Sequence, residues 1–142
     1  TTKLPAGIKQ ALVVLFPNSK DAAEPYRSIV FEHDLKDFPL GVYRMINLSA
    51  YPFRGAIGRD YTESKPGGIA NLQPKGEPGS VVPVRFEYFA KDRWNLLSET
   101  RCAIRSDRRW LTCIYEDPTT GRMNIRSIPD RTPPPAVATP PN

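Results

Sequence analysis

The stretch Ser80-Val-Val-Pro-Val-Arg-Phe-Glu-Tyr-Phe89 decides the fold of this 142-residue chain. Its apolar side chains alternate with other residues, so that Val82, Val84 and Phe86 lie on one side of an extended segment. Alternation of this kind is typical of a β-strand with one buried face. Pro83 has no backbone N–H to donate, which favours a sheet edge for the beginning of the strand.

Similar segments lie on both sides of this strand. The chain turns at Lys91-Asp92-Arg93 and continues extended from Trp94 to Arg105. Further short strands are predicted over residues 8–16, 27–32, 42–49, 53–59, 61–64, 69–72 and 122–128. The 16 prolines punctuate these segments and argue against long helices. We therefore predict an all-β sandwich or barrel of short strands, with very little helix.

The domain is predicted to span residues 6–128. From Pro129 onward, the last fourteen residues hold six prolines and no aromatic residue, so residues 129–142 are expected to form an extended or disordered tail outside the core. The longest uninterrupted apolar run, Ala11 to Phe16, is far too short to span a membrane.

Two cysteines lie on either side of a predicted turn over residues 106–109. If the flanking strands pair as a hairpin, Cys102 falls opposite Cys113, and Ile104 opposite Leu111. A non-hydrogen-bonded antiparallel pair brings its Cα atoms to about 4.5 Å, which a disulfide tolerates. We therefore predict a cross-strand disulfide, which indicates an oxidising compartment. Two buried free thiols facing each other are the alternative.

The same predicted hairpin carries the strongest basic feature of a chain whose net charge is +5. The residues that crowd it are Arg101, Arg105, Arg108, Arg109 and Trp110. Alternation places several of them on the face opposite the cysteines, where an arginine stacked on a tryptophan would suit a peptide or a polyanion. The alternative is a solvated sheet face whose arginines pair with Glu87, Glu99 and Glu116 across the strands.

Aromatic residues suggest a second kind of surface, because flat rings stack on sugars. The candidates are Tyr61, Tyr88, Trp94, Trp110 and Tyr115. We expect Tyr88 to point inward and Trp94 to seal one end of the core.

The sequence offers little for catalysis. His33 is the only histidine, and we expect it on a solvated loop between Glu32 and Asp34. It has no partners at the spacing of a zinc site, and there is no nucleophile elbow, phosphate loop or dinucleotide fingerprint. We predict no catalytic residues, no metal and no cofactor. Asn47-Leu48-Ser49 is formally a glycosylation sequon inside a predicted strand.

The segments 30–49 and 53–58 resemble small exported bacterial β-sandwich proteins of unknown function. The shared features are the strand containing Pro39, Gly41 and Arg44, a Pro-Gly turn, and a late arginine-rich hairpin. This resemblance implies a single immunoglobulin- or transthyretin-like sandwich of antiparallel strands, export, and no assigned activity. The chain begins without methionine, as it would after removal of a leader, so we expect a secreted or periplasmic protein.

These observations together predict a non-enzymatic, exported interaction module. Its partner would be a protein, a glycan or a polyanion of the cell envelope. The alternatives are a carbohydrate-binding module that uses exposed aromatic rings, and a β-barrel that binds nucleic acid or another polyanion; nucleic acid is the less expected ligand, because the charge excess is moderate.

Overall fold

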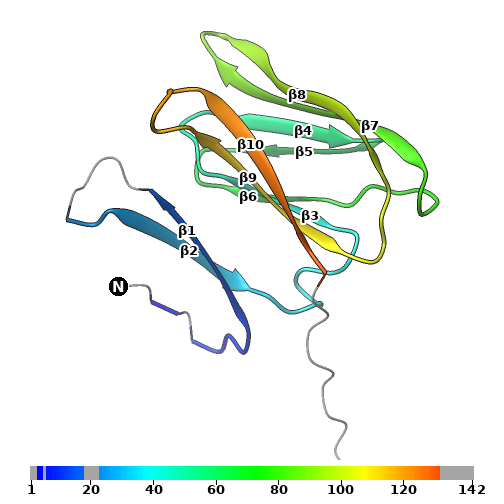
Figure 1. Cartoon of the computed structure of the whole chain (residues 1–142), viewed down its shortest axis with the longest axis horizontal. Coiled ribbons are helices and arrows are strands. Elements are labelled where there is room, and N and C mark those ends of the chain that lie inside the picture. The colour runs from blue at the N-terminus through cyan, green and yellow to red at the C-terminus, as the bar shows by residue number, and fades with distance from the viewer. Residues whose placement is uncertain (1–2, 5, 18–22, 132–142) are drawn as a thin grey trace, which may run out of the picture.

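The protein is an all-β sandwich, as predicted (Figure 1). The computed structural model describes residues 3–4, 6–17 and 23–131, and over these residues it contains ten strands and no helix. Accordingly, no helix in this part of the chain is available to cross a membrane.

The strands are β1 (Ala11–Pro17), β2 (Tyr26–Glu32), β3 (Tyr43–Asn47), β4 (Phe53–Ile57), β5 (Asp60–Ser64), β6 (Ile69–Leu72), β7 (Val81–Ala90), β8 (Arg93–Ala103), β9 (Arg109–Glu116) and β10 (Met123–Asp130). The first sheet has the order β10-β9-β3-β6, and the second has the order β5-β4-β7-β8. β1 and β2 form a separate two-stranded hairpin.

One strand pair departs from the expected antiparallel arrangement. β3 and β9 are parallel neighbours at the centre of the first sheet, whereas all other pairs are antiparallel. Parallel neighbours need a long connection, and here all four strands of the second sheet, together with β6, lie between β3 and β9 in the chain.

The main core lies between the two sheets. Met45 and Ile114 from the first sheet meet Phe53 and Phe86 from the second, and all four are buried. Gly55 in β4 is required by this packing, because a Cβ there would lie 2.5 Å from the nearest carbon of the Phe86 ring. The buried face predicted for the strand at residues 80–89 is therefore the face that packs between the sheets.

The β1–β2 hairpin adds a third layer over the outside of the first sheet (Figure 1). Its Phe31 packs with Ile46, Leu111 and Cys113, which point away from the main core. β3 is consequently buried along its whole length. None of the described strands covers the outer face of the second sheet in the same way.

The predicted disulfide is wrong: both cysteines are free. The chain does not fold back as a hairpin between β8 and β9 but crosses from the second sheet to the first. Cys102 therefore pairs with β7 and packs against the main core, whereas Cys113 lies between β3 and β10 and faces the third layer. Ile104, expected opposite Leu111, is buried in the crossing segment instead.

The described end of the chain also differs from the prediction. β10 continues to Asp130, two residues past the expected boundary, and pairs Pro129 with Trp110 and Asp130 with Arg109. The rest of the predicted tail, residues 132–142, lies outside the described residues.

At the β7–β8 turn the prediction is confirmed, since Lys91 and Asp92 both have positive φ (54° and 58°), as in a two-residue hairpin of type I′.

Candidate ligand-binding face

The arginine-rich residues predicted as a binding surface do not share one face. Arg101 is exposed on β8, opposite Pro83 of the second sheet, whereas Arg109 belongs to the first sheet and is 1% exposed. Trp110 is half-buried and stacks on Tyr43, with ring centroids 4.3 Å apart and planes at 1°. The crossing between β8 and β9 separates residues that a hairpin would have kept together.

Arg105 and Arg108 form a small closed cluster with Asp107 in this crossing. Arg105 Nε lies 3.2 Å from Asp107 Oδ1, and Arg108 Nη2 lies 2.7 Å from Oδ2. Hydrogen bonds from Arg108 and then from Arg105 hold the pKa of the Asp107 carboxyl well below its usual range. The positive charge of both arginines is therefore partly neutralised within the loop.

Arg109 fastens three parts of the chain together. Its Nε donates to Asp130 Oδ2 (2.9 Å) in β10, and its Nη2 donates to the carbonyl oxygen of His33 (3.1 Å). Its Nη1 donates to the carbonyl oxygen of Phe38. The Phe38 ring also contacts the guanidinium groups of Arg109 and Arg44, whose Cζ atoms lie 4.7 and 4.6 Å from the ring centre. This cluster, which we call the Arg109 staple, holds the β2–β3 connection against the first sheet.

His33 is part of the staple, so the expectation of a solvated loop histidine is wrong. Its Nε2 lies 2.7 Å from Arg109 Nη2 and 3.0 Å from Asp130 Oδ2, and its Nδ1 is buried without a hydrogen-bond partner. Burial and the positive charge of Arg109 lower the pKa of His33, which favours the neutral imidazole. No group of three His, Cys, Asp or Glu side chains among the described residues could hold a metal ion.

The sequon residue Asn47 is fully buried. Its amide nitrogen donates to the carbonyl oxygens of Tyr51 (2.8 Å), Lys65 (3.2 Å) and Ser64 (3.3 Å), and its oxygen accepts from Ser49. Asn47 thus connects the turn before β4 with the end of β5. Its side chain is not accessible in the folded protein.

The uncovered face of the second sheet carries an ordered set of polar and aromatic side chains. Strand pairing places them in two rows across the sheet. The first row is Tyr61, Ala56, Arg85 and Glu99, and the second is Glu63, Arg54, Glu87 and Leu96. A β-bulge beside Glu87 shifts the register between the rows. We call this surface the open face.

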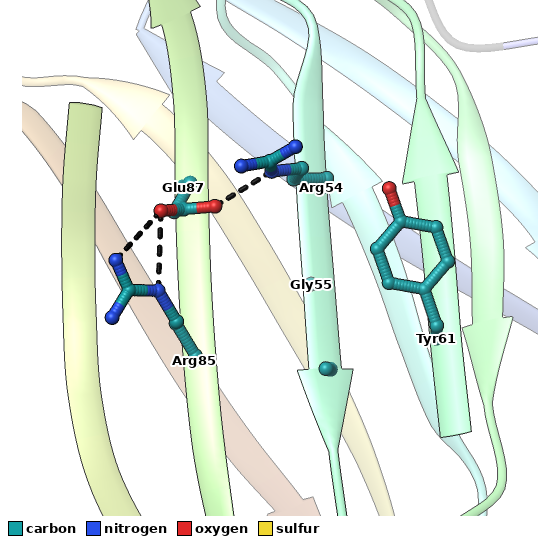
Figure 2. Close-up of a pocket in the computed structure, with 6 residues that line it drawn as sticks. Arg54, Gly55, Tyr61, Arg85 and Glu87 are labelled. Atoms are coloured by element: carbon teal, nitrogen blue, oxygen red, sulfur yellow. Dashed lines mark hydrogen bonds and ion pairs between the residues drawn. The ribbon is translucent and has the colours of Figure 1, made fainter. Parts of the chain in front are cut away.

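Glu87 holds the centre of the open face. Its Oε2 accepts from Arg54 Nε (2.6 Å), and its Oε1 accepts from Arg85 Nη2 (2.9 Å) and Nε (3.1 Å), while Arg85 Nη1 reaches Glu99 Oε2 (2.7 Å). The hydrogen bonds from Arg85 and then from Arg54 lower the pKa of Glu87. The two guanidinium groups are thus fixed on either side of one carboxylate, as Figure 2 shows.

Two aromatic rings flank this network. Trp94 is half-buried beneath Arg54, whose guanidinium lies 4.2 Å from the ring centre, and it packs edge-on against Phe89. Tyr61 is 54% exposed, and its hydroxyl donates to the carboxylate of Glu63, which raises the pKa of the phenol. Figure 2 shows the Tyr61 ring beside β4, with its flat side turned toward the viewer.

Between Tyr61 and the Arg85–Glu87 pair lies a shallow hollow of about 340 Å³. Its lining residues are Arg54, Gly55, Ala56, Tyr61, Arg85 and Glu87. The small side chain of Ala56 leaves the sheet surface low at this point, between the larger Tyr61 and Arg85. The hollow was not predicted from the sequence, although alternation in residues 53–57 and 84–88 puts Arg54, Arg85 and Glu87 on the solvent side of their strands.

Comparison with family models, with curated proteins and with solved structures finds no match to this chain. The resemblance to small exported β-sandwich proteins therefore stays a prediction.

Proposed function

We propose that this chain is a non-catalytic binding module and that the open face is its recognition surface. The observation that carries the proposal is the Arg54–Glu87–Arg85 network beside the exposed ring of Tyr61, on the outer face of the second sheet, which no described strand covers.

Pre-organisation supports this function. The side chain of Glu87 is only 12% exposed and uses both oxygens to hold the arginines, so their guanidinium groups are ordered before any ligand arrives. Ordered side chains lose less conformational entropy on binding. Tyrosine and arginine are also enriched among the residues that dominate binding energies.

The chemistry of the same residues favours binding over catalysis. An effective general acid or base has a pKa near the working pH. The pKa of Glu87 is shifted downward and that of Tyr61 upward, so both shifts lead away from neutrality. His33 is engaged in the Arg109 staple, which belongs to the other sheet.

We also propose that the protein is exported from the cytoplasm, and only the resemblance to small exported β-sandwich proteins supports this part of the proposal. Because Cys102 and Cys113 are free, they give no argument for an oxidising compartment.

The proposal is tested by comparing two double variants with the wild type. Tyr61→Ala with Arg85→Ala alters the open face, and Tyr26→Ala with Arg105→Ala is a matched control on other exposed surfaces. Each protein is passed over immobilised neutral glycans, a sulfated polysaccharide, anionic lipid vesicles and a peptide library.

We expect the wild type to bind one of these classes, the open-face variant to lose at least about tenfold in affinity, and the control to bind as the wild type does. Unfolding midpoints within a few degrees of the wild type show that the variants are folded. Equal affinity in the open-face variant, or no binding to any class by the wild type, contradicts the proposed function.

A further inference from the structure

We infer that the ligand of the open face is a neutral carbohydrate, with one sugar ring seated in the hollow against Tyr61. This inference rests on the proposed function and names its ligand class. Three features of the hollow carry it: a flat exposed ring, a dense mixture of donors and acceptors, and a balanced charge.

Tyr61 is the aromatic ring best placed to be a platform. Arg54 lies over Trp94, and Trp110 stacks on Tyr43, so one face of each indole ring is occupied and both residues are half-buried. Tyr61, by contrast, is 54% exposed, and its hydroxyl is held by Glu63. A fixed ring that lies against the sheet presents a flat apolar surface to the C–H groups of a sugar.

Hydroxyl groups both donate and accept hydrogen bonds, and the surroundings of Tyr61 supply both functions. Arg54, Arg85 and Glu87 line the hollow with N–H groups and carboxylate oxygens, and Glu63 lies beside Arg54 in the second row. Charged groups that are already ordered form stronger hydrogen bonds to neutral hydroxyls than neutral partners do.

The charge of the open face argues against a polyanion. Its two rows carry the cationic residues Arg54 and Arg85 and the anionic residues Glu63, Glu87 and Glu99, and Arg101 lies on the same side of the sheet, opposite Pro83. A sulfated or phosphorylated chain would gain attraction from the arginines and repulsion from the carboxylates along the same path, whereas an uncharged polyhydroxyl ligand meets no such repulsion.

The size of the hollow fits one sugar ring. Small-molecule sites have volumes of about 300–1,000 Å³, and the hollow lies at the low end with about 340 Å³. Because the face is open on the solvent side, the neighbouring rings of an oligosaccharide can continue over the sheet.

The test is a titration followed by ¹H–¹⁵N NMR, with neutral oligosaccharides of glucose, xylose, mannose, galactose and N-acetylglucosamine, and with sulfated dextran and an acidic peptide as competitors of other classes. We expect one neutral series to shift the amide signals of Gly55, Ala56 and Arg85. Tyr61→Phe keeps the platform and should stay within about threefold of the wild-type Kd, whereas Tyr61→Ala should raise the Kd at least about tenfold. Tyr26→Ala, at a tyrosine of the third layer that is 65% exposed, should leave the Kd unchanged.

The possible outcomes distinguish failure of the carbohydrate inference from failure of the proposed function. If sulfated dextran or the peptide shifts these signals and no neutral series does, the carbohydrate inference is overturned while the proposed function stands. If Tyr61→Phe loses as much affinity as Tyr61→Ala, stacking is not the basis of binding, and the inference is overturned on that ground. If a neutral sugar binds but shifts only signals outside the open face, both proposals fall.

Discussion

Replacing Arg109 by methionine tests whether the Arg109 staple stabilises the fold. Methionine keeps an unbranched apolar stem but offers no hydrogen-bond donor. The change removes the ion pair with Asp130, the donors to the carbonyl oxygens of His33 and Phe38, and the cation–π contact with the Phe38 ring.

The size of the effect follows from burial. Arg109 is 1% exposed, so the acceptors that it leaves cannot all reach bulk water. Breaking a buried pair by removing one partner costs about 3–5 kcal/mol, out of a total stability of about 5–15 kcal/mol for a typical domain. For a chain of this length, we expect Tm to fall by about 10–20 °C.

The assay is thermal and urea unfolding followed by circular dichroism. Arg105→Met is the matched control. The side chain of Arg105 is 46% exposed and, among the described residues, pairs with Asp107 alone, so we expect a loss below about 1 kcal/mol. Asp130→Asn combined with Arg109→Met should be less destabilising than the sum of the single changes by about 0.5–3 kcal/mol, because both remove the same interaction. A loss below about 1 kcal/mol for Arg109→Met, or strict additivity of the pair, would refute the reasoning.

Three further predictions follow from buried groups. The folded pKa of His33 lies below its unfolded value of about 6.5, so the unfolded chain binds more protons between these two values. The free energy of unfolding should therefore fall as the pH drops from about 6.5 toward 5. In urea unfolding, His33→Gln should make this dependence on pH less steep. Gly55→Ala should destabilise the fold by about 1–3 kcal/mol, because its Cβ would lie 2.5 Å from the Phe86 ring, and an unchanged unfolding midpoint would contradict that packing. Without reductant, the denatured protein should react with a thiol reagent at both Cys102 and Cys113, and a mass corresponding to an oxidised pair would contradict the free thiols.

Local sequence pattern predicted the strands well because alternation is a local property. From Val82 to Phe86, β7 carries its less exposed residues at every second position, and the turn at Lys91 and Asp92 needs only its own residues. The pattern does not say to which sheet a strand belongs. β8 and β9 have the spacing of a hairpin, yet they form ladders with β7 and with β3 and β10, so the cysteine pairing inferred from spacing failed.

For the same reason, the local pattern could not predict which arginine is buried. Arg108 and Arg109 are neighbours of identical type, but only Arg109 meets His33 and Phe38, which are more than seventy positions earlier in the chain. The open face, by contrast, could be predicted in part from the sequence of one strand. Arg85 and Glu87 alternate visibly with Val84 and Phe86, so this half of the network could have been read from β7, but their partner Arg54 depends on the pairing of β4 with β7.

The third layer has a consequence for motion. The β1–β2 hairpin has no strand partner among the described residues beyond its own two strands, so it can open without breaking either four-stranded ladder. The Arg109 staple holds the chain just after β2, so this end of the hairpin is fastened to the first sheet. Such a sub-global opening would uncover Cys113, and its labelling rate in the native protein would report the opening equilibrium of this layer. The protein would then have, on the side opposite the open face, a two-stranded layer with its own free energy of opening.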